Sequence, residues 1–175
     1  MNRYILVILG ILLSAVAALA QSISLLDKVP GHRVTFDYVY SLEKDGRPMS
    51  EVTRGEALVE DNCYVLTGLG LKIYSDGATR VSIDPDAKEV LVETVDKEDV
   101  FTNPALFIGA YKSYRERITV LSSSKDALSV TLRLDEDALV RFDLSKVRFE
   151  PLQGREGFSP DLSFFGQDYQ ITDLR

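Results

Sequence analysis

The sequence predicts a mainly β fold of the α+β class, in which a helix interrupts one long, twisted antiparallel sheet. Short segments of alternating apolar and polar residues recur along the chain, as in strands with one buried face. The turns between them are short and rich in Asp, Asn and Gly, so neighbouring strands must run antiparallel. One stretch near the middle of the chain has helical spacing instead.

The chain opens with MNRYILVILGILLSAVAALA, which has the pattern of a secretory signal peptide. Arg3 precedes a long apolar run, and the small residues Ala18-Leu19-Ala20 form a cleavage site before Gln21. A membrane anchor is the alternative, but the run lies at the lower limit of spanning length and its small-residue end favours cleavage. No cysteine follows the run, so no lipid anchor is expected. We expect residues 1–20 to be removed and residues 21–175 to form one exported domain.

Composition argues against several classes of partner. The net charge of −7 becomes −8 once the leader and its single charged residue are removed. An acidic exported protein repels phosphates, so we expect neither nucleic acid nor anionic headgroups as partners. The only cysteine, Cys63, cannot form an internal disulfide, and its place at a strand start favours a partly buried thiol over a nucleophile. The only histidine, His32, is expected in a loop before the first strand.

The first predicted strand, residues 34–42, has the clearest alternation. One of its faces is apolar and aromatic, formed by Val34, Phe36, Tyr38, Tyr40 and Leu42. The turn residues Lys44-Asp45-Gly46 end it. Further strands are expected at residues 52–59, 63–67, 71–75, 79–83 and 89–95.

Residues 102–114 predict the helix. Asn103 suits the N-cap and Pro104 the first helical position. An apolar stripe of helical spacing follows, made of Leu106, Phe107, Ala110, Tyr111 and Tyr114. Strands resume at residues 118–121, 128–134, 139–144 and 147–149, and the tail at 170–174 is expected to close the sheet as an edge strand.

The stretch YSDGATRVSIDPDAKEVLV, residues 74–92, concentrates carboxylates that raise the question of a metal or acid–base site: Asp76, Asp84, Asp86 and Glu89. Asp76-Gly77 and Asp84-Pro85 fit turns, and a calcium loop starting at Asp84 fails because Lys88 occupies its fifth position. The sequence has no nucleophile–histidine arrangement, zinc set or phosphate loop. We therefore expect no enzyme, no cofactor and no metal, with a two-carboxylate carbohydrate hydrolase as the alternative.

Five motifs follow one another along the chain: Gly55-Glu56-Ala57-Leu58-Val59, Ser75-Asp76-Gly77-Ala78-Thr79, Asp84-Pro85, Asn103-Pro104 and the tail Tyr169–Arg175. In this order the chain resembles the LolA-like lipoprotein carriers of Gram-negative periplasms, and the tail resembles that of Bacteroidetes-type members. The resemblance covers most of the chain from about residue 34 to residue 175.

The resemblance implies a half-open β-barrel around an apolar cavity with a helical lid. It implies a periplasmic monomer that carries acyl chains of lipoproteins or other lipids between inner-membrane donor and outer-membrane acceptor proteins. The expected cavity residues are Phe36, Tyr38, Tyr40, Leu66, Ile73 and Val81. The expected lid residues are Leu106, Phe107, Ala110 and Tyr114. For these residues ordinary core is the alternative, and for the function the alternative is a lipid- or partner-sensing module on the same scaffold.

Two features depart from the family pattern. The family carries a basic residue and Pro, which help to lock the lid, in the turn where this chain has Glu60-Asp61-Asn62. Arg54, on the preceding strand, is the candidate replacement. The first helix is also short, because only Ser22 to Lys28 precede Pro30.

Overall fold

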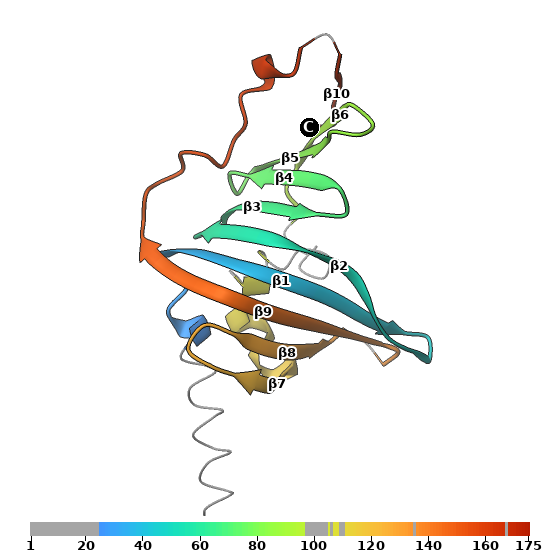
Figure 1. The fold of residues 1–175 in the computed structure, drawn as a ribbon, viewed down its shortest axis with the longest axis vertical. Helices are drawn as coiled ribbons and strands as arrows, with labels where there is room; N and C mark the ends of the chain where they lie inside the picture. The colour runs from blue at the N-terminus through green and yellow to red at the C-terminus, as the bar shows by residue number, and fades with distance from the viewer. Residues whose placement is uncertain (1–24, 97–104, 106, 109–110, 135, 167) are drawn as a thin grey trace, which may run out of the picture.

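The computed structural model describes residues 25–96, 105, 107–108, 111–134, 136–166 and 168–175. Ten strands form one open sheet in the order β10-β6-β5-β4-β3-β2-β1-β9-β8-β7 (Figure 1). The strands are β1 (His32–Lys44), β2 (Arg47–Glu60), β3 (Cys63–Gly68), β4 (Leu71–Ser75), β5 (Thr79–Asp84), β6 (Glu89–Thr94), β7 (Ile118–Ser123), β8 (Leu128–Arg133), β9 (Ala138–Pro151) and β10 (Gln170–Asp173). The prediction of a mainly β fold is confirmed.

Strands β1 to β6 form consecutive antiparallel hairpins, as the short turns predict. In the turn between β1 and β2, Asp45 and Gly46 have φ values of 54° and 72°. Such a pair suits a two-residue turn whose twist matches that of the flanking strands. The chain therefore turns where Lys44-Asp45-Gly46 predicts it.

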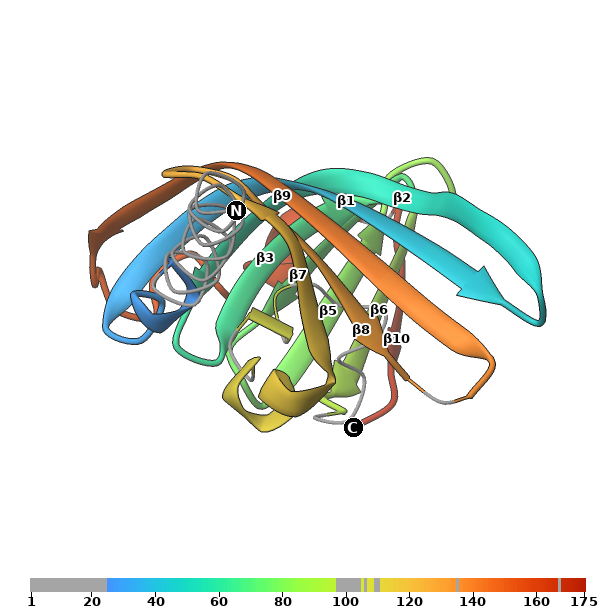
Figure 2. The same cartoon turned by 90° about the horizontal axis from the view of Figure 1, so that it is seen from below.

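The sheet is strongly curved, and a short helical segment lies within its curve (Figure 2). Ala105, Phe107 and Ile108 are helical, and the 3₁₀ helix η1 (Tyr111–Arg117) follows. We call these residues the lid segment and the side of the sheet that they cover the concave face. The opposite side is the convex face. The lid segment belongs to the connection from β6 to β7, two strands that lie far apart in the sheet order.

Strand β9 corrects the prediction of separate strands at residues 139–144 and 147–149. The two segments form one strand with a register shift where β9 passes β1. Lys146, with φ 54°, supplies the extra residue of this β-bulge. The bulge lets Leu144 and Val147, three positions apart, both be buried.

A second correction concerns the end of the chain. Strand β10 pairs with β6 in parallel, so the expectation of a purely antiparallel sheet is wrong at this edge. The connection from β9 to β10, residues 152–169, runs along the sheet as an extended strap and contains the short 3₁₀ helix η2 (Leu162–Phe164) (Figure 1). We call it the strap. It is long because it must cross the sheet from β9 to β10, which lies at the far edge beside β6.

The N-terminal segment completes the main core. Leu25, Leu26 and Val29 are buried in the same apolar cluster as the concave face. The Tyr111 hydroxyl donates a hydrogen bond to Asp27, which ties this segment to η1. Burial, with this hydrogen bond, raises the pKa of Tyr111 to about 12. Among the described residues no helix is long and apolar enough to cross a membrane. The predicted leader lies outside them.

Candidate functional site

Most of the predicted cavity residues lie together on the concave face: Phe36, Tyr38, Tyr40, Leu66 and Ile73. Phe36, Ala57, Leu66 and Ile73 stand directly opposite one another across four strands. Apolar residues of β8 and β9, among them Val130, Val140 and Phe142, extend the same core. From β8 to β4 the concave face is thus largely apolar, whereas on β5 and β6 it carries Ser82 and the Arg80–Glu93 ion pair beside Leu91.

Val81 is the exception, and its expected place in the cavity is wrong. Val81 pairs with Tyr74, whereas Ile73 pairs with Ser82, so Val81 and Ile73 face opposite sides of the sheet. Val81 belongs to a second apolar cluster on the convex face, with Ile83, Val90 and Val92. Strap residues cover this cluster: Leu162, Phe165 and Tyr169.

Tyr38 is fixed by the backbone around it. Its hydroxyl donates to the Thr67 carbonyl oxygen at 2.9 Å. Two glycines leave room for this arrangement, because a Cβ on Gly55 would lie 1.7 Å from that carbonyl oxygen and one on Gly68 would lie 2.5 Å from the Tyr38 hydroxyl oxygen. Burial raises the pKa of Tyr38, and a hydrogen bond with Thr53 opposes this shift. The tyrosine therefore anchors β1 to β3 beneath β2.

The lid segment inserts the aromatic rings of Phe107 and Tyr111 into the concave face. Phe107 is fully buried, and its ring stacks on Phe142 with centroids 4.7 Å apart and planes 11° apart. Tyr114 packs partly buried against the same core. Two of the predicted lid residues, Leu106 and Ala110, lie outside the described residues.

The apolar concave face is more fully buried at one end than at the other. Phe36, Ala57 and Leu66 are each at most 5% exposed. The same row continues through Ser82 of β5 to Leu91 of β6. In this part of the row, Ile73 and Leu91 are only partly buried. This half-buried stretch extends across β4 to β6.

Two of the four carboxylates of residues 74–92, those of Asp76 and Asp84, hold turns together. The Asp76 carboxylate accepts hydrogen bonds from the backbone N–H groups of Ala78 and Thr79 at 2.9 and 2.8 Å. The Asp84 carboxylate does the same for Asp86 and Ala87 at 2.9 and 2.8 Å. Within the part of the chain that the structure describes, no group of three or more His, Cys, Asp or Glu residues is placed to hold a metal ion.

Three residues that the sequence analysis considered for a functional role make contacts that indicate a structural one. Cys63 is buried, and burial raises the pKa of its thiol, which disfavours the nucleophilic thiolate. His32 begins β1, rather than preceding it, and packs edge-on against Phe149. Arg54 makes two hydrogen bonds to the exposed Glu51 carboxylate, at 2.7 and 2.6 Å, so among the described residues its side chain is engaged within β2 and not by the lid segment.

Glu60, the last residue of β2, binds the strap. Its carboxylate accepts from Arg33 Nε at 2.6 Å and from the backbone N–H groups of Gln153 and Gly154 at 3.2 and 2.7 Å. Burial would raise the pKa of Glu60, but these hydrogen bonds outweigh it and the pKa is lowered. The Arg33 guanidinium also lies over the buried Phe158 ring, at 5.2 Å from its centroid. This cluster anchors the start of the strap.

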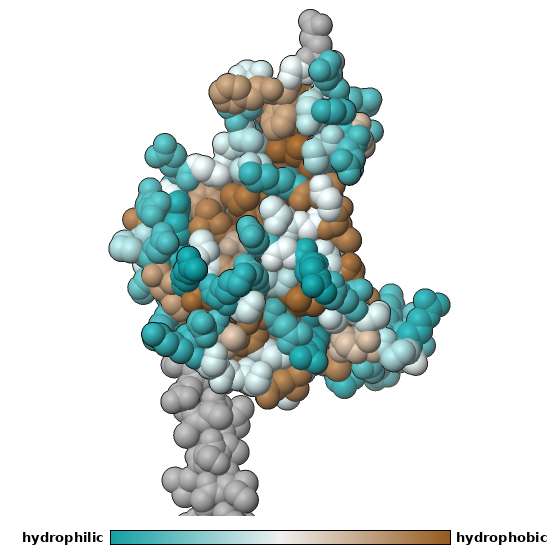
Figure 3. Space-filling view, in the orientation of Figure 1, coloured by the Kyte–Doolittle hydropathy of each residue, from teal (hydrophilic) through white to brown (hydrophobic). Residues whose placement is uncertain are grey.

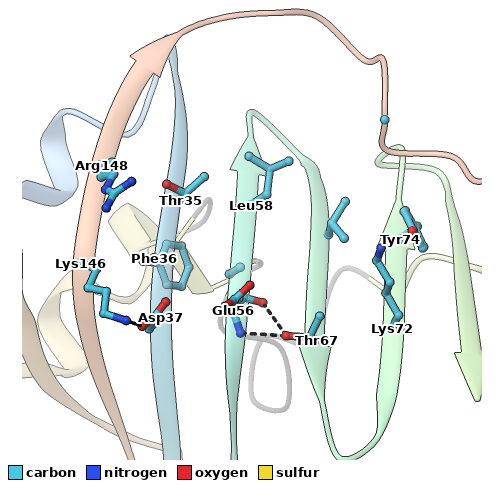
Figure 4. Close-up of a pocket in the computed structure, with 13 residues that line it drawn as sticks. Thr35, Phe36, Asp37, Glu56, Leu58, Thr67, Lys72, Tyr74, Lys146 and Arg148 are labelled. Carbon is cyan, nitrogen blue, oxygen red and sulfur yellow. Dashed lines mark hydrogen bonds and ion pairs between the residues drawn. The ribbon is translucent and has the colours of Figure 1, made fainter.

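A groove of about 640 Å³ lies on the convex face, where sequence reasoning expected no site (Figure 4). Its floor and walls come from β9, β1, β2, β3 and β4, and include Thr35, Leu58, Val65, Tyr74, Lys72 and Arg148. Asp37 also lines it and pairs with Lys146, with 2.6 Å between the carboxylate oxygen and Nζ. Figure 3 shows apolar surface on this side of the molecule between hydrophilic side chains.

Asp37 and Glu56 stand opposite each other in this groove, which is the arrangement that a carbohydrate hydrolase would need. The Lys146 ammonium already engages the Asp37 carboxylate in an ion pair, so the two carboxylates do not form an isolated pair. No protein-family model matches the sequence, and a search of curated proteins finds no match.

Proposed function

We propose that the protein is a periplasmic carrier that binds acyl chains of lipoproteins or other lipids on its concave face and shuttles them toward the outer membrane. The supporting observation is an open, curved sheet whose concave face is apolar from β8 to β4 and is only partly buried at Ile73 and at Leu91. A sheet that does not close on itself has no opposing strands to fill that face. The lid segment and the N-terminal turn fill it instead.

The energetics favour an acyl chain as ligand. Each buried CH₂ group contributes about 0.8 kcal/mol, so a long chain gains on the order of 10 kcal/mol before ordering costs are subtracted. Entry begins at the partly buried Ile73 and Leu91 and continues toward Leu66 and Phe36. The chain then reaches the surface that the lid segment occupies.

Release requires a competitor for the same surface. Phe107 stacks on Phe142, so an acyl chain that reaches Phe142 must displace the Phe107 ring. When the chain leaves, Phe107 returns and keeps the apolar face out of water. The gain from ligand burial is thereby partly offset by the cost of opening, which keeps binding reversible.

The test is titration of delipidated protein with a fluorescent fatty acid, 11-(dansylamino)undecanoic acid, followed by displacement with palmitate. Saturable binding is expected, with a blue-shifted dansyl emission. Leu91→Gln places a polar group on the half-buried concave surface and is expected to weaken binding about tenfold, since a buried polar group without a partner costs roughly 1–3 kcal/mol.

Leu121→Gln is the matched control, because Leu121 is 51% exposed on the edge strand β7 and far along the sheet order from β6. It is expected to bind like the unmodified protein. Binding that is absent, or equal in both variants, would rule out the concave face as the acyl-chain site.

The alternative is a sensing module that binds the same ligand but reports to one partner. Retrieval from envelope extract separates the two, because a carrier collects many lipoproteins whereas a sensor collects a single protein. The groove on the convex face supports this alternative, because it offers a binding surface to a protein partner.

A further inference from the structure

We propose that the groove on the convex face binds an extended, acidic and aromatic peptide segment of a partner protein. This inference concerns the face opposite the acyl-chain site and does not depend on that site. Three observations carry it. Part of an apolar row on the convex face is uncovered, the strap covers the rest of that row, and cationic side chains lie at both ends of the groove.

The apolar surface is a row of residues that stand opposite one another across the strands. We call it the convex row: Thr35, Leu58, Val65, Tyr74, Val81 and Val92. Its first four members line the groove, and Leu58, Val65 and Tyr74 are only partly buried. Its last two members, Val81 and Val92, are at most 7% exposed. The row is therefore covered at one end and open at the other.

The strap supplies the cover at the closed end. Leu162, Phe165 and Tyr169 pack on the cluster that contains Val81 and Val92, and Tyr74 joins that cluster at the boundary with the groove. The covering part of the strap reads SPDLSFFGQDY, residues 159–169, with two aspartates and no basic residue. Apolar and aromatic side chains, carried by a segment that includes η2, thus already cover this end of the row. Among the strap residues that the structure describes, only Gly157 lines the groove, so the rest of the row is open to another molecule.

Charges at the two ends of the groove suit such a segment. Arg148 lies opposite Thr35 at the β9 end, is exposed, and has no ion-pair partner among the residues that the structure describes. Lys72 lies at the β4 end with its ammonium 5.1 Å from the centroid of the Tyr74 ring. Asp37 is neutralised by Lys146, so Arg148 and Lys72 outnumber the remaining acid, Glu56. The groove is cationic in a protein whose net charge is −7.

The separation of the two cations argues for a peptide over a single anionic headgroup. Arg148 and Lys72 are four strand steps apart in the sheet order. At about 4.8 Å per step this is roughly 19 Å, the length of about six residues of extended chain. One phosphate or carboxylate cannot reach both cations, whereas an extended segment with an acidic residue at each end can. Its apolar side chains then rest on Leu58 and Val65.

The test uses a fluorescein-labelled peptide of sequence SPDLSFFGQDY and fluorescence anisotropy with the purified protein. Binding is expected, and the double variant Arg148→Glu, Lys72→Glu is expected to weaken it about tenfold or more, because charge reversal replaces attraction by repulsion at both ends. Lys125→Glu, in the exposed turn before β8, is the matched control and is expected to leave binding unchanged. A peptide with both aspartates replaced by lysine is expected to bind the double variant better than the unmodified protein.

Each other outcome overturns the proposal. A peptide that fails to bind at about 1 mM has no useful affinity for the groove. A peptide that binds the double variant and the unmodified protein equally must occupy another surface, such as the one the strap covers. If the double variant loses palmitate binding while keeping peptide binding, the groove takes a lipid instead.

Discussion

Replacement of Phe107 by Ala separates a lid that competes with ligand from a fixed piece of core. Phe107 is fully buried against Phe142, and truncation of a buried Phe costs about 3–5 kcal/mol. For a chain of this size, each kcal/mol lowers Tm by about 2–4 °C, so a fall of roughly 6–20 °C is expected without ligand. If the ring competes with an acyl chain, the ligand no longer has to displace it, so part of that free energy is recovered as tighter ligand binding. Fatty-acid affinity should then rise about tenfold for each 1.4 kcal/mol recovered.

The assay combines thermal unfolding followed by circular dichroism with displacement of 11-(dansylamino)undecanoic acid by palmitate. Palmitate is expected to raise the Tm of Phe107→Ala more than that of the unmodified protein. Phe107→Leu, which removes the stacking but keeps much of the volume, gives a milder variant with the same direction of change.

Phe158→Ala is the matched control. Phe158 is also almost fully buried, but it lies beneath Arg33 at the start of the strap. It should lose stability by a similar amount without any gain in fatty-acid affinity. The reasoning is refuted if Phe107→Ala loses stability and its affinity stays the same or falls, because Phe107 is then ordinary core.

Three further predictions test the fold around the site. Gly55→Ala should lower the free energy of unfolding by about 1–3 kcal/mol in urea titration, because its Cβ would lie 1.7 Å from a backbone oxygen; Gly166→Ala, with open space around it, should change it by less than about 0.5 kcal/mol. The lowered pKa of Glu60 means that its stabilising contribution is present above about pH 4.3, the unfolded value, and is lost as pH falls through the folded pKa; Glu60→Gln should therefore show a shallower loss of stability between pH 5 and about pH 3, and parallel pH profiles would contradict this. Removal of residues 159–175 should uncover the convex cluster and increase binding of the dye ANS, whereas unchanged dye fluorescence would mean that the strap is not its cover.

The strands could be predicted because each carries its own signal. Alternation and short turns locate β1 and β3 to β5 to within one or two residues, since these features are local. The bulge at Lys146 could not be predicted, because Ser145-Lys146 resembles a polar turn until β1 is known to pair on both sides of it. One strand, β9, therefore contains the two segments that the alternation of apolar and polar residues predicts as separate strands.

The side of the sheet on which a strand buries its apolar residues was harder to predict than the strands it pairs with. Val81 and Ile83 alternate with polar residues, which shows that one face of β5 is buried but not which layer buries it. The covering layer is the strap, whose Gly, Pro and Asp residues resemble an ordinary loop. That its apolar side chains cover a cluster on the sheet becomes clear only once the sheet beneath them is known.

The groove was missed for a related reason. Each strand contributes only one or two of its residues, and Arg148 and Thr35 are separated by more than a hundred positions in the sequence. No spacing along the chain links these residues before the register is known. The concave residues Phe36, Tyr38 and Tyr40 were predictable because a single strand carries all three.

Native mass spectrometry of the protein purified from the periplasm of an expression host tests the central claim most directly. We expect a protein mass that lacks residues 1–20, with a further population heavier by one acyl-chain ligand that collisional activation or organic extraction removes. Leu91→Gln should reduce that population and Leu121→Gln should not. A single ligand-free mass that stays unchanged after incubation with palmitate or a lipoprotein would contradict the carrier function.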